Sequence, residues 1–221
     1  EKDAYDVDVD FDDDDLPENR VQQEQIAHDD DLDNATKESL CQLGKRRSDS
    51  FTKLYSDLKT FKEANNTDED IKNLFDDMHE MQTTTELGLK MIVVMMYPPT
   101  SSYKATPKDS LQNRTMKDVM CQNIDKRQIS IVETFPYAHG KKSGDFNQVL
   151  LEKLLRTNEA FAQIIGTYME DMIRLERAAQ LVRNPKMKNS KSCIYIGGQI
   201  ASLAMSKLPN LKFTFTHCPC P

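Results

Sequence analysis

The chain has 221 residues, of which 38% are hydrophobic and 29% are charged, and its formal net charge is −7. This length favours one globular domain with a tail, and the longest apolar run, residues 91–97, is too short to span a bilayer. Five scattered cysteines, an odd number, argue against a disulfide framework and predict reduced thiols in an intracellular, cytoplasmic protein.

The N-terminal segment, residues 1–33, is an acidic arm. It holds fifteen Asp and Glu against Lys2 and Arg20, which gives −13, so the rest of the chain carries +6. Because it has few apolar groups and repels itself, the arm is predicted to be disordered when free. Asp12 to Asp15 could bind calcium but lack the spacing of a calcium loop. We expect the arm to dock on a basic protein surface instead.

One amphipathic helix is predicted after the arm, from Leu40 to Phe61. Its apolar residues recur at helical spacing, and Arg47 interrupts the stripe. The mostly polar residues 63–70 end the helix. The spacing therefore predicts one apolar face that packs on a core.

A second helix is predicted over residues 71–96. Thr67 and Asp70 are a plausible N-cap pair, and apolar residues follow at helical spacing. Gly88 and the threonines before it are poor helix formers, so a kink is expected there. Pro98 and Pro99 end the helix because they lack an N–H donor and clash with the preceding turn.

The middle of the chain predicts a short helix around residues 111–124, a strand over 129–135 and an exposed loop over 136–145. Glu133, His139 and Asp145 flank this loop and could form an acid–base cluster. A polar loop with one histidine is more often only a connection.

The longest apolar stripe predicts a helix over residues 146–182, with Asp145 as its cap. A near-heptad pattern runs through it, and Asn184-Pro185 ends it. We expect this helix to organise the fold.

The closing segment, residues 193–216, predicts a strand, a helix and a second strand. Residues 193–196 are apolar, residues 200–208 have helical spacing, and residues 211–216 alternate. A strand, helix and strand in so short a segment form a parallel crossover. The predicted fold is thus mainly helical α+β, with long amphipathic helices on a small sheet, in a single domain over 34–221.

Two glycines follow the strand at 193–196. Gly197, Gly198 and Gln199 resemble the turn at which a ligand approaches a helix N-terminus, and they are the weak candidates for a cofactor- or ligand-binding site. They match neither a dinucleotide fingerprint nor a P-loop. The alternative is a tight turn that only lets the chain fold back, and no catalytic residue is predicted there.

His217, Cys218 and Cys220 stand together at the end of the sequence, and Cys193 could be a fourth ligand. Soft ligands of this kind bind Zn²⁺ or Cu(I), although the spacing fits zinc poorly. They are weak metal candidates, and the alternative is a chain end with exposed thiols. No cofactor is predicted.

The helix sequence DMIRLERA (Asp171, Leu175, Arg177) followed by CIYIGGQIASL resembles the C-terminal part of an uncharacterised protein family of large nucleocytoplasmic DNA viruses. That family has an Asp-x-x-x-Leu-x-Arg helix and an apolar strand that ends in a glycine turn, usually followed by a histidine. Here Gln199 or Ile200 holds the histidine position, so an obvious base or ligand is missing.

These features predict a structural or scaffolding protein that binds other proteins through apolar helical faces. The resemblance implies a virion or assembly component. The alternative is a small α/β enzyme or ligand-binding domain with its site at Gly197 to Gln199. Five lysines and no acid lie between residues 186 and 212, so a nucleic-acid-associated protein is a third possibility. Nucleic acid is not expected as a partner, because no nucleic-acid-binding motif accompanies these lysines.

Overall fold

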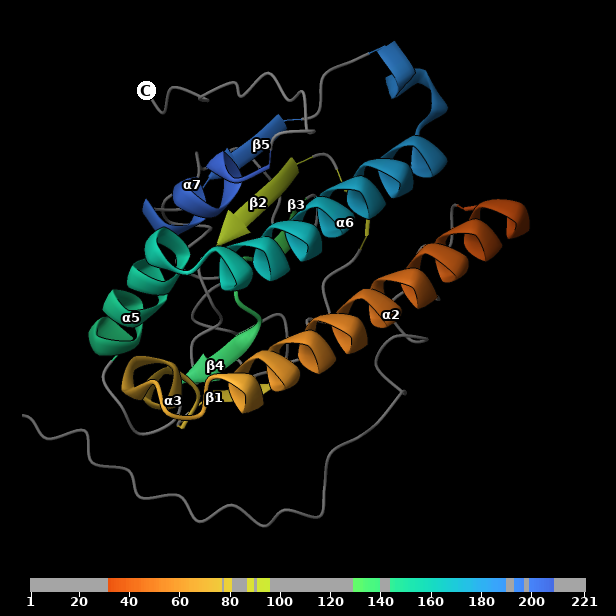
Figure 1. Cartoon of the computed structure of the whole chain (residues 1–221). Helices are drawn as coiled ribbons and strands as arrows, with labels where there is room; N and C mark the ends of the chain where they lie inside the picture. The colour runs from red at the N-terminus through yellow and green to blue at the C-terminus, as the bar shows by residue number, and fades with distance from the viewer. Residues whose placement is uncertain are drawn as a thin grey trace, which may run out of the picture.

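A computed structural model describes residues 32–76, 78–80, 87–89, 91–95, 129–139, 144–189, 193–196 and 199–208. The helices are α2 (Asn34–Ala64), α3 (Glu69–Phe75), α5 (Gly144–Thr157), α6 (Glu159–Arg183), the 3-10 helix η3 (Pro185–Asn189) and α7 (Gln199–Ser206). The strands are β1 (Met78–Glu80), β2 (Met91–Met95), β3 (Ile129–Glu133), β4 (Tyr137–His139) and β5 (Cys193–Ile196). The described part is mainly helical with two small sheets, which confirms the predicted α+β class (Figure 1).

The larger sheet is parallel, with strand order β3-β2-β5. The central strand is β2, whose Ile92 and Val94 lie on one face of the sheet and are completely buried. From β3 the chain passes through β4, α5 and α6 before it reaches β5 on the other side of β2. The strand predicted over 129–135 is confirmed for Ile129–Glu133, and the strand predicted over 193–196 is confirmed throughout. The predicted strand at 211–216 lies outside the described residues.

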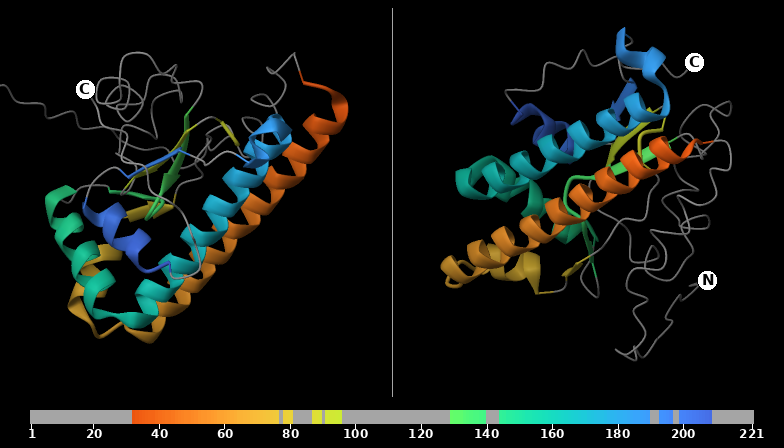
Figure 2. Two further views of the ribbon diagram at one scale, coloured as in Figure 1. Left: turned by 90° about the horizontal axis from the view of Figure 1, so that it is seen from above. Right: turned by 90° about the vertical axis from the view of Figure 1, so that its right-hand side faces the viewer.

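The two long helices, α2 and α6, lie side by side and run antiparallel (Figures 1 and 2). Near the end of α2, Phe61 contacts Phe161 at the start of α6, with ring centroids 5.5 Å apart. Near the start of α2, Leu40 and Leu43 share an apolar cluster with Leu175 and Ala179 of α6. This pairing joins segments more than a hundred residues apart.

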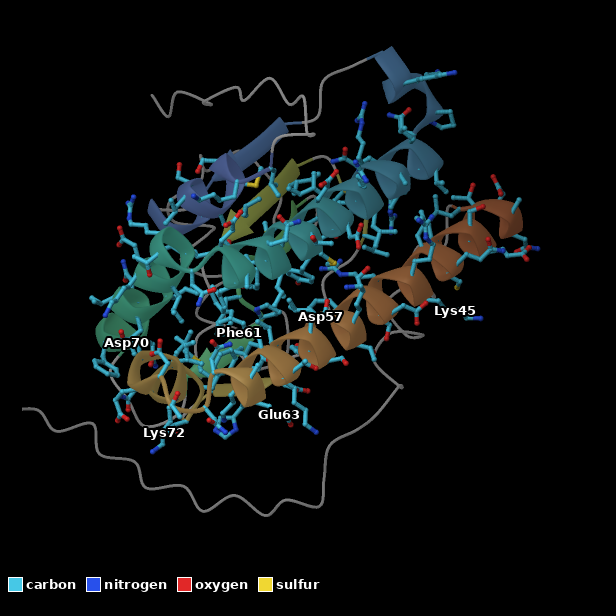
Figure 3. The ribbon with its side chains drawn as sticks, viewed as in Figure 1. Lys45, Asp57, Phe61, Glu63, Asp70 and Lys72 are labelled. Carbon is cyan, nitrogen blue, oxygen red and sulfur yellow. The ribbon has the colours of Figure 1, made fainter. Side chains whose placement is uncertain are left out.

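Helix α2 follows the predicted apolar stripe. Phe61 turns toward the core, whereas Lys45 and Glu63 point to solvent (Figure 3). Asp33 caps the helix, since its side chain accepts a 2.8 Å hydrogen bond from the Thr36 amide, and this bond lowers the pKa of Asp33. Asp33 thus belongs to the helix rather than to the acidic arm, and residues 1–31 lie outside the described part.

The predicted helix over 71–96 is wrong beyond its first turns. Helix α3 ends at Phe75, Met78 opens β1, and residues 91–95 form β2. Strand β2 pairs with β3 and β5, so both of its edges are satisfied, and this outweighs its helical spacing. The N-cap also differs from the prediction: the Asp68 carboxylate, rather than Thr67, accepts from the Asp70 amide at 2.9 Å.

The predicted helix over 146–182 is two helices. Asn158 separates α5 from α6 and caps α6, since its side chain accepts from the Phe161 amide at 2.9 Å. Helix α5 already begins at Gly144, so Asp145 is not the residue before it, and part of the predicted loop forms β4, which pairs with β1. Because α5 and α6 bury the same core, the apolar stripe continues across the break.

The core at the start of α6 is expected to be sensitive to side-chain volume. Ile165 is completely buried. We expect Ile165→Ala to lower the free energy of unfolding by about 3 kcal/mol, because it removes buried methyl groups and leaves a cavity. Urea unfolding of the full chain measures this loss. Thr167→Ala, on the exposed face of the same helix, should cost less than about 0.5 kcal/mol, and equal losses would contradict a core role for Ile165.

Candidate functional site

The carboxyl ends of the three parallel strands lie at one edge of the sheet. Met95 is in register with Glu133, and Val94 with Ile196. Strand β2 is central, and the chain forms β3 on one side of it before it forms β5 on the other side. The order in which strands are added to the sheet therefore reverses at β2, so this edge is a topological switch point. Open α/β sheets bind their ligands at such points.

The predicted glycine turn follows β5 in the sequence. The chain leaves β5 at Ile196, and Gln199 is the first residue of α7. Gly197 and Gly198, together with the side chain of Gln199, lie outside what the structure describes. The described residues show only that β5 ends at this edge and that α7 follows, and they give no contact of these three residues.

Glu133 ends β3 at the same edge and is only 1% exposed. Burial raises its pKa to about 8, so its carboxyl group is mostly protonated at neutral pH. The predicted cluster of Glu133, His139 and Asp145 is divided among three elements. Glu133 lies in the parallel sheet, His139 in the two-stranded sheet opposite Met78, and Asp145 in α5.

A buried ion pair joins α2 to α6, and only one of its members stood out in the sequence. An Nη of Arg47 lies 2.6 Å from Oε1 of Glu176, and the other Nη donates to the Ile131 carbonyl at 3.1 Å. Arg47 and Glu176 are 5% and 0% exposed. The interruption of the apolar stripe by Arg47 was the available signal, since a buried guanidinium requires a partner.

Glu176 also fixes the segment that precedes β2. Its Oε2 accepts from the Gly88 amide at 2.8 Å. One and two turns further along α6, Gln180 donates to the Leu89 carbonyl at 2.5 Å and Arg183 to the Leu87 carbonyl at 2.7 Å. Three side chains of one helix thus bind the backbone of residues 87–89.

The charge state of Glu176 follows from these contacts. Burial raises the pKa of Glu176 above its ordinary value, and Arg47, the Gly88 amide and a hydrogen bond from Ser130 offset part of this rise. With a guanidinium at 2.6 Å and two further donors, we assign Glu176 as ionised at neutral pH. The network is therefore a paired charge that holds α2, α6, β3 and residues 87–89 together.

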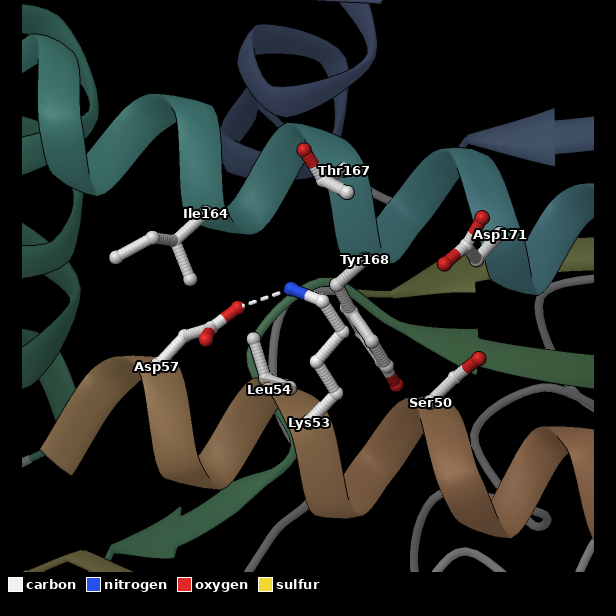
Figure 4. Close-up of a pocket in the computed structure, with 8 residues that line it drawn as sticks. All are labelled: Ser50, Lys53, Leu54, Asp57, Ile164, Thr167, Tyr168 and Asp171. Carbon is white, nitrogen blue, oxygen red and sulfur yellow. Dashed lines mark hydrogen bonds and ion pairs between the residues drawn. The ribbon is translucent and has the colours of Figure 1, made fainter. Parts of the chain in front are cut away.

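A shallow groove runs between α2 and α6 (Figure 4). Lys53 and Asp57 form a 2.5 Å ion pair at its rim, and both are substantially exposed. The Tyr168 side chain points from α6 toward α2, and its buried hydroxyl has no hydrogen-bond partner within the described part of the chain. Burial raises the pKa of Tyr168 above its ordinary range, so this phenol remains protonated.

Of the four residues predicted as metal candidates, only the backbone of Cys193 is described by the structure. His217, Cys218 and Cys220 are outside the described residues, and Cys193 is described only as the first residue of β5. Within the described ranges, no three His, Cys, Asp or Glu side chains are placed to hold a metal ion. Cys41 has a free, exposed thiol.

Together these features define a mainly helical α+β protein with a three-stranded parallel sheet and a buried ionic network. Among the described helices, none is long and apolar enough to cross a membrane. No family model, no curated protein and no solved structure matches the chain.

The buried carboxyl of Glu133 should make stability depend on pH. Its folded pKa of about 8 exceeds the ordinary 4.5, so its favourable contribution is complete below pH 4.5 and is lost as pH rises to 8. Glu133→Gln removes this dependence, and we expect it to raise the free energy of unfolding by roughly 2–3 kcal/mol at pH 8 and little at pH 5. Urea unfolding at both values tests this, and an equal effect at pH 5 and pH 8 would contradict a buried, protonated Glu133.

Proposed function

We propose that this protein is a structural or scaffolding component that acts by binding other protein chains. The observation that supports this is an exposed apolar pair on α5. Phe146 and Val149 are 43% and 64% exposed, and they lie three residues apart, on one face of the helix. Contiguous exposed apolar patches mark protein-binding surfaces, and in this proposal Phe146 and Val149 belong to one.

The pair of long helices α2 and α6, which a buried ion pair joins, suits such a role. Helix α2 is 31 residues long and α6 is 25, and the Arg47–Glu176 pair joins them inside the molecule. A platform fixed by a buried, hydrogen-bonded ion pair presents its outer residues in one geometry. In this proposal the acidic arm adds an electrostatic contact to a basic surface, and the protein acts inside the cell.

The narrower proposal, a component of a virion or of its assembly machinery, rests on the sequence resemblance alone. It is supported by the pattern of Asp171, Leu175 and Arg177 and by the glycine turn. No contact within the described part of the chain adds to this support.

Site-specific crosslinking tests the protein-binding proposal. A photo-crosslinking amino acid at Val149 in the full chain should capture one defined polypeptide, either a second copy or a different protein, in the cells that contain it. The same group at Ala160, an exposed position on α6, is the matched control. Equal and diffuse labelling from both positions would contradict a binding face on α5.

A second candidate function is a ligand-binding domain or small enzyme. The switch point at the carboxyl edge favours it, since β5 ends there beside β2. Gln199→Ala distinguishes the two candidates. A scaffold should keep its assembly state and biological activity, whereas a ligand site should lose activity while the protein remains folded.

A further inference from the structure

The acidic arm joins the described part of the chain beside the C-terminal end of α6. Leu32, the first described residue, packs on the apolar cluster that contains Leu175 and Ala179 of α6. Val182, the second-last residue of α6, packs on the same cluster. The left view of Figure 2 shows the start of α2 beside the end of α6. Residues 1–31 must therefore leave the described body at this end.

The same end of α6, with η3, presents basic side chains to solvent. We call residues 174–189 the basic end. This stretch contains a single acid, Glu176, which is completely buried and paired with Arg47. Lys186 and Lys188 are exposed on η3 and form no ion pair within the described part. The cationic residues of the basic end are Arg174, which is paired with Glu170, and Arg177, Arg183, Lys186 and Lys188.

The charge of the arm complements this surface. Residues 1–31 contain fourteen acidic residues against Lys2 and Arg20, a net charge of −12. Asp29, Asp30 and Asp31 come directly before Leu32, so they can extend no further than about 10 Å from it. That reach is about one Debye length at 0.1 M salt, and a tether of this kind gives an effective concentration in the millimolar range.

We propose that residues 1–31 dock on the basic end of the same chain. This goes beyond the proposed function, in which the arm binds a basic partner, because that partner must first compete with η3 and the end of α6. The occupant is the arm itself, and its contacts are carboxylates of the arm with the ammonium and guanidinium groups of residues 174–189.

The rate of cleavage by trypsin after Arg20 measures this docking in the full chain, because Arg20 lies in the middle of the arm. We expect cleavage after Arg20 at low salt to be at least about threefold slower than at 0.5 M salt, where charges are screened. Each rate is divided by that of a synthetic peptide of residues 10–31 in the same buffer, which removes the effect of salt on the protease. Lys186→Glu with Lys188→Glu should abolish the slowing.

The matched control is Lys59→Glu with Lys72→Glu, an equal change of charge at exposed positions near the end of α2 and on α3, which lies opposite η3 in Figure 1. This variant should retain the slow cleavage. The proposal is overturned if Arg20 of the wild type is cleaved as fast as the free peptide at low salt, or if both variants accelerate cleavage equally. Crosslinking from Val149 does not depend on this result, so the two proposals fail separately.

Discussion

Replacing Gly88 with alanine is expected to lower the free energy of unfolding by at least about 4 kcal/mol. Gly88 has a φ of +72°, in the left-handed region. A Cβ there would lie 2.2 Å from the Ala179 carbonyl carbon and 2.4 Å from the Gln180 amide nitrogen. Both are backbone atoms of α6 and cannot rotate away, so either residues 87–89 or the helix must move. Chemical denaturation of the full chain measures the loss.

Gly44→Ala is the matched control, since it makes the same chemical change in an open position. The added Cβ would meet only Leu87, at 3.9 Å, and Gly44 lies inside α2. Alanine favours the helix by about 0.5–1 kcal/mol over glycine, so this variant should be slightly more stable than the wild type. A Gly88→Ala protein as stable as Gly44→Ala would show that residues 87–89 do not approach α6 this closely.

Breaking the Arg47–Glu176 pair has the second large expected effect. Glu176→Leu leaves the buried guanidinium of Arg47 without its carboxylate, and Arg47→Met leaves Glu176 without its cation. We expect each single change to cost about 3–5 kcal/mol, because each leaves an uncompensated buried charge. The double variant should lose much less than the sum, since it replaces both charges with apolar side chains.

Urea unfolding of the four proteins gives the coupling free energy. The exposed pair of Lys53 and Asp57 offers a comparison, because it also joins one positive and one negative side chain, but at the surface. Lys53→Met and Asp57→Leu should each cost less than about 1 kcal/mol and show little coupling. Additive losses at Arg47 and Glu176 would contradict a buried ionic network.

Local patterns were sufficient for several elements of this protein. The stripe from Leu40 to Phe61 predicted α2, because a surface helix repeats its apolar side chains every three to four residues. Residues 129–133 and 193–196 are short apolar runs, and both are strands of the parallel sheet. The helix predicted at 200–208 is α7, displaced by one or two residues. In each case the local preference agrees with the tertiary environment.

Other features depend on contacts between distant residues. Met91–Met95 has helical spacing but is a strand, because β3 and β5 satisfy both of its edges. Arg47 interrupts an apolar stripe, and only the fold shows that Glu176, 129 residues away, is its partner. The position of the carboxyl end of β5 at a switch point likewise depends on the strand order.

The sequence alone determined the charge of this protein, most of its helices and the apolar segments that enter the core, because these depend on residues close together in the chain. The tertiary structure decided which apolar segment became the central strand, why Gly88 must be glycine and which basic surface lies beside the acidic arm. Those outcomes depend on strand edges, buried charges and surfaces that distant segments supply. A local sequence pattern does not contain this information.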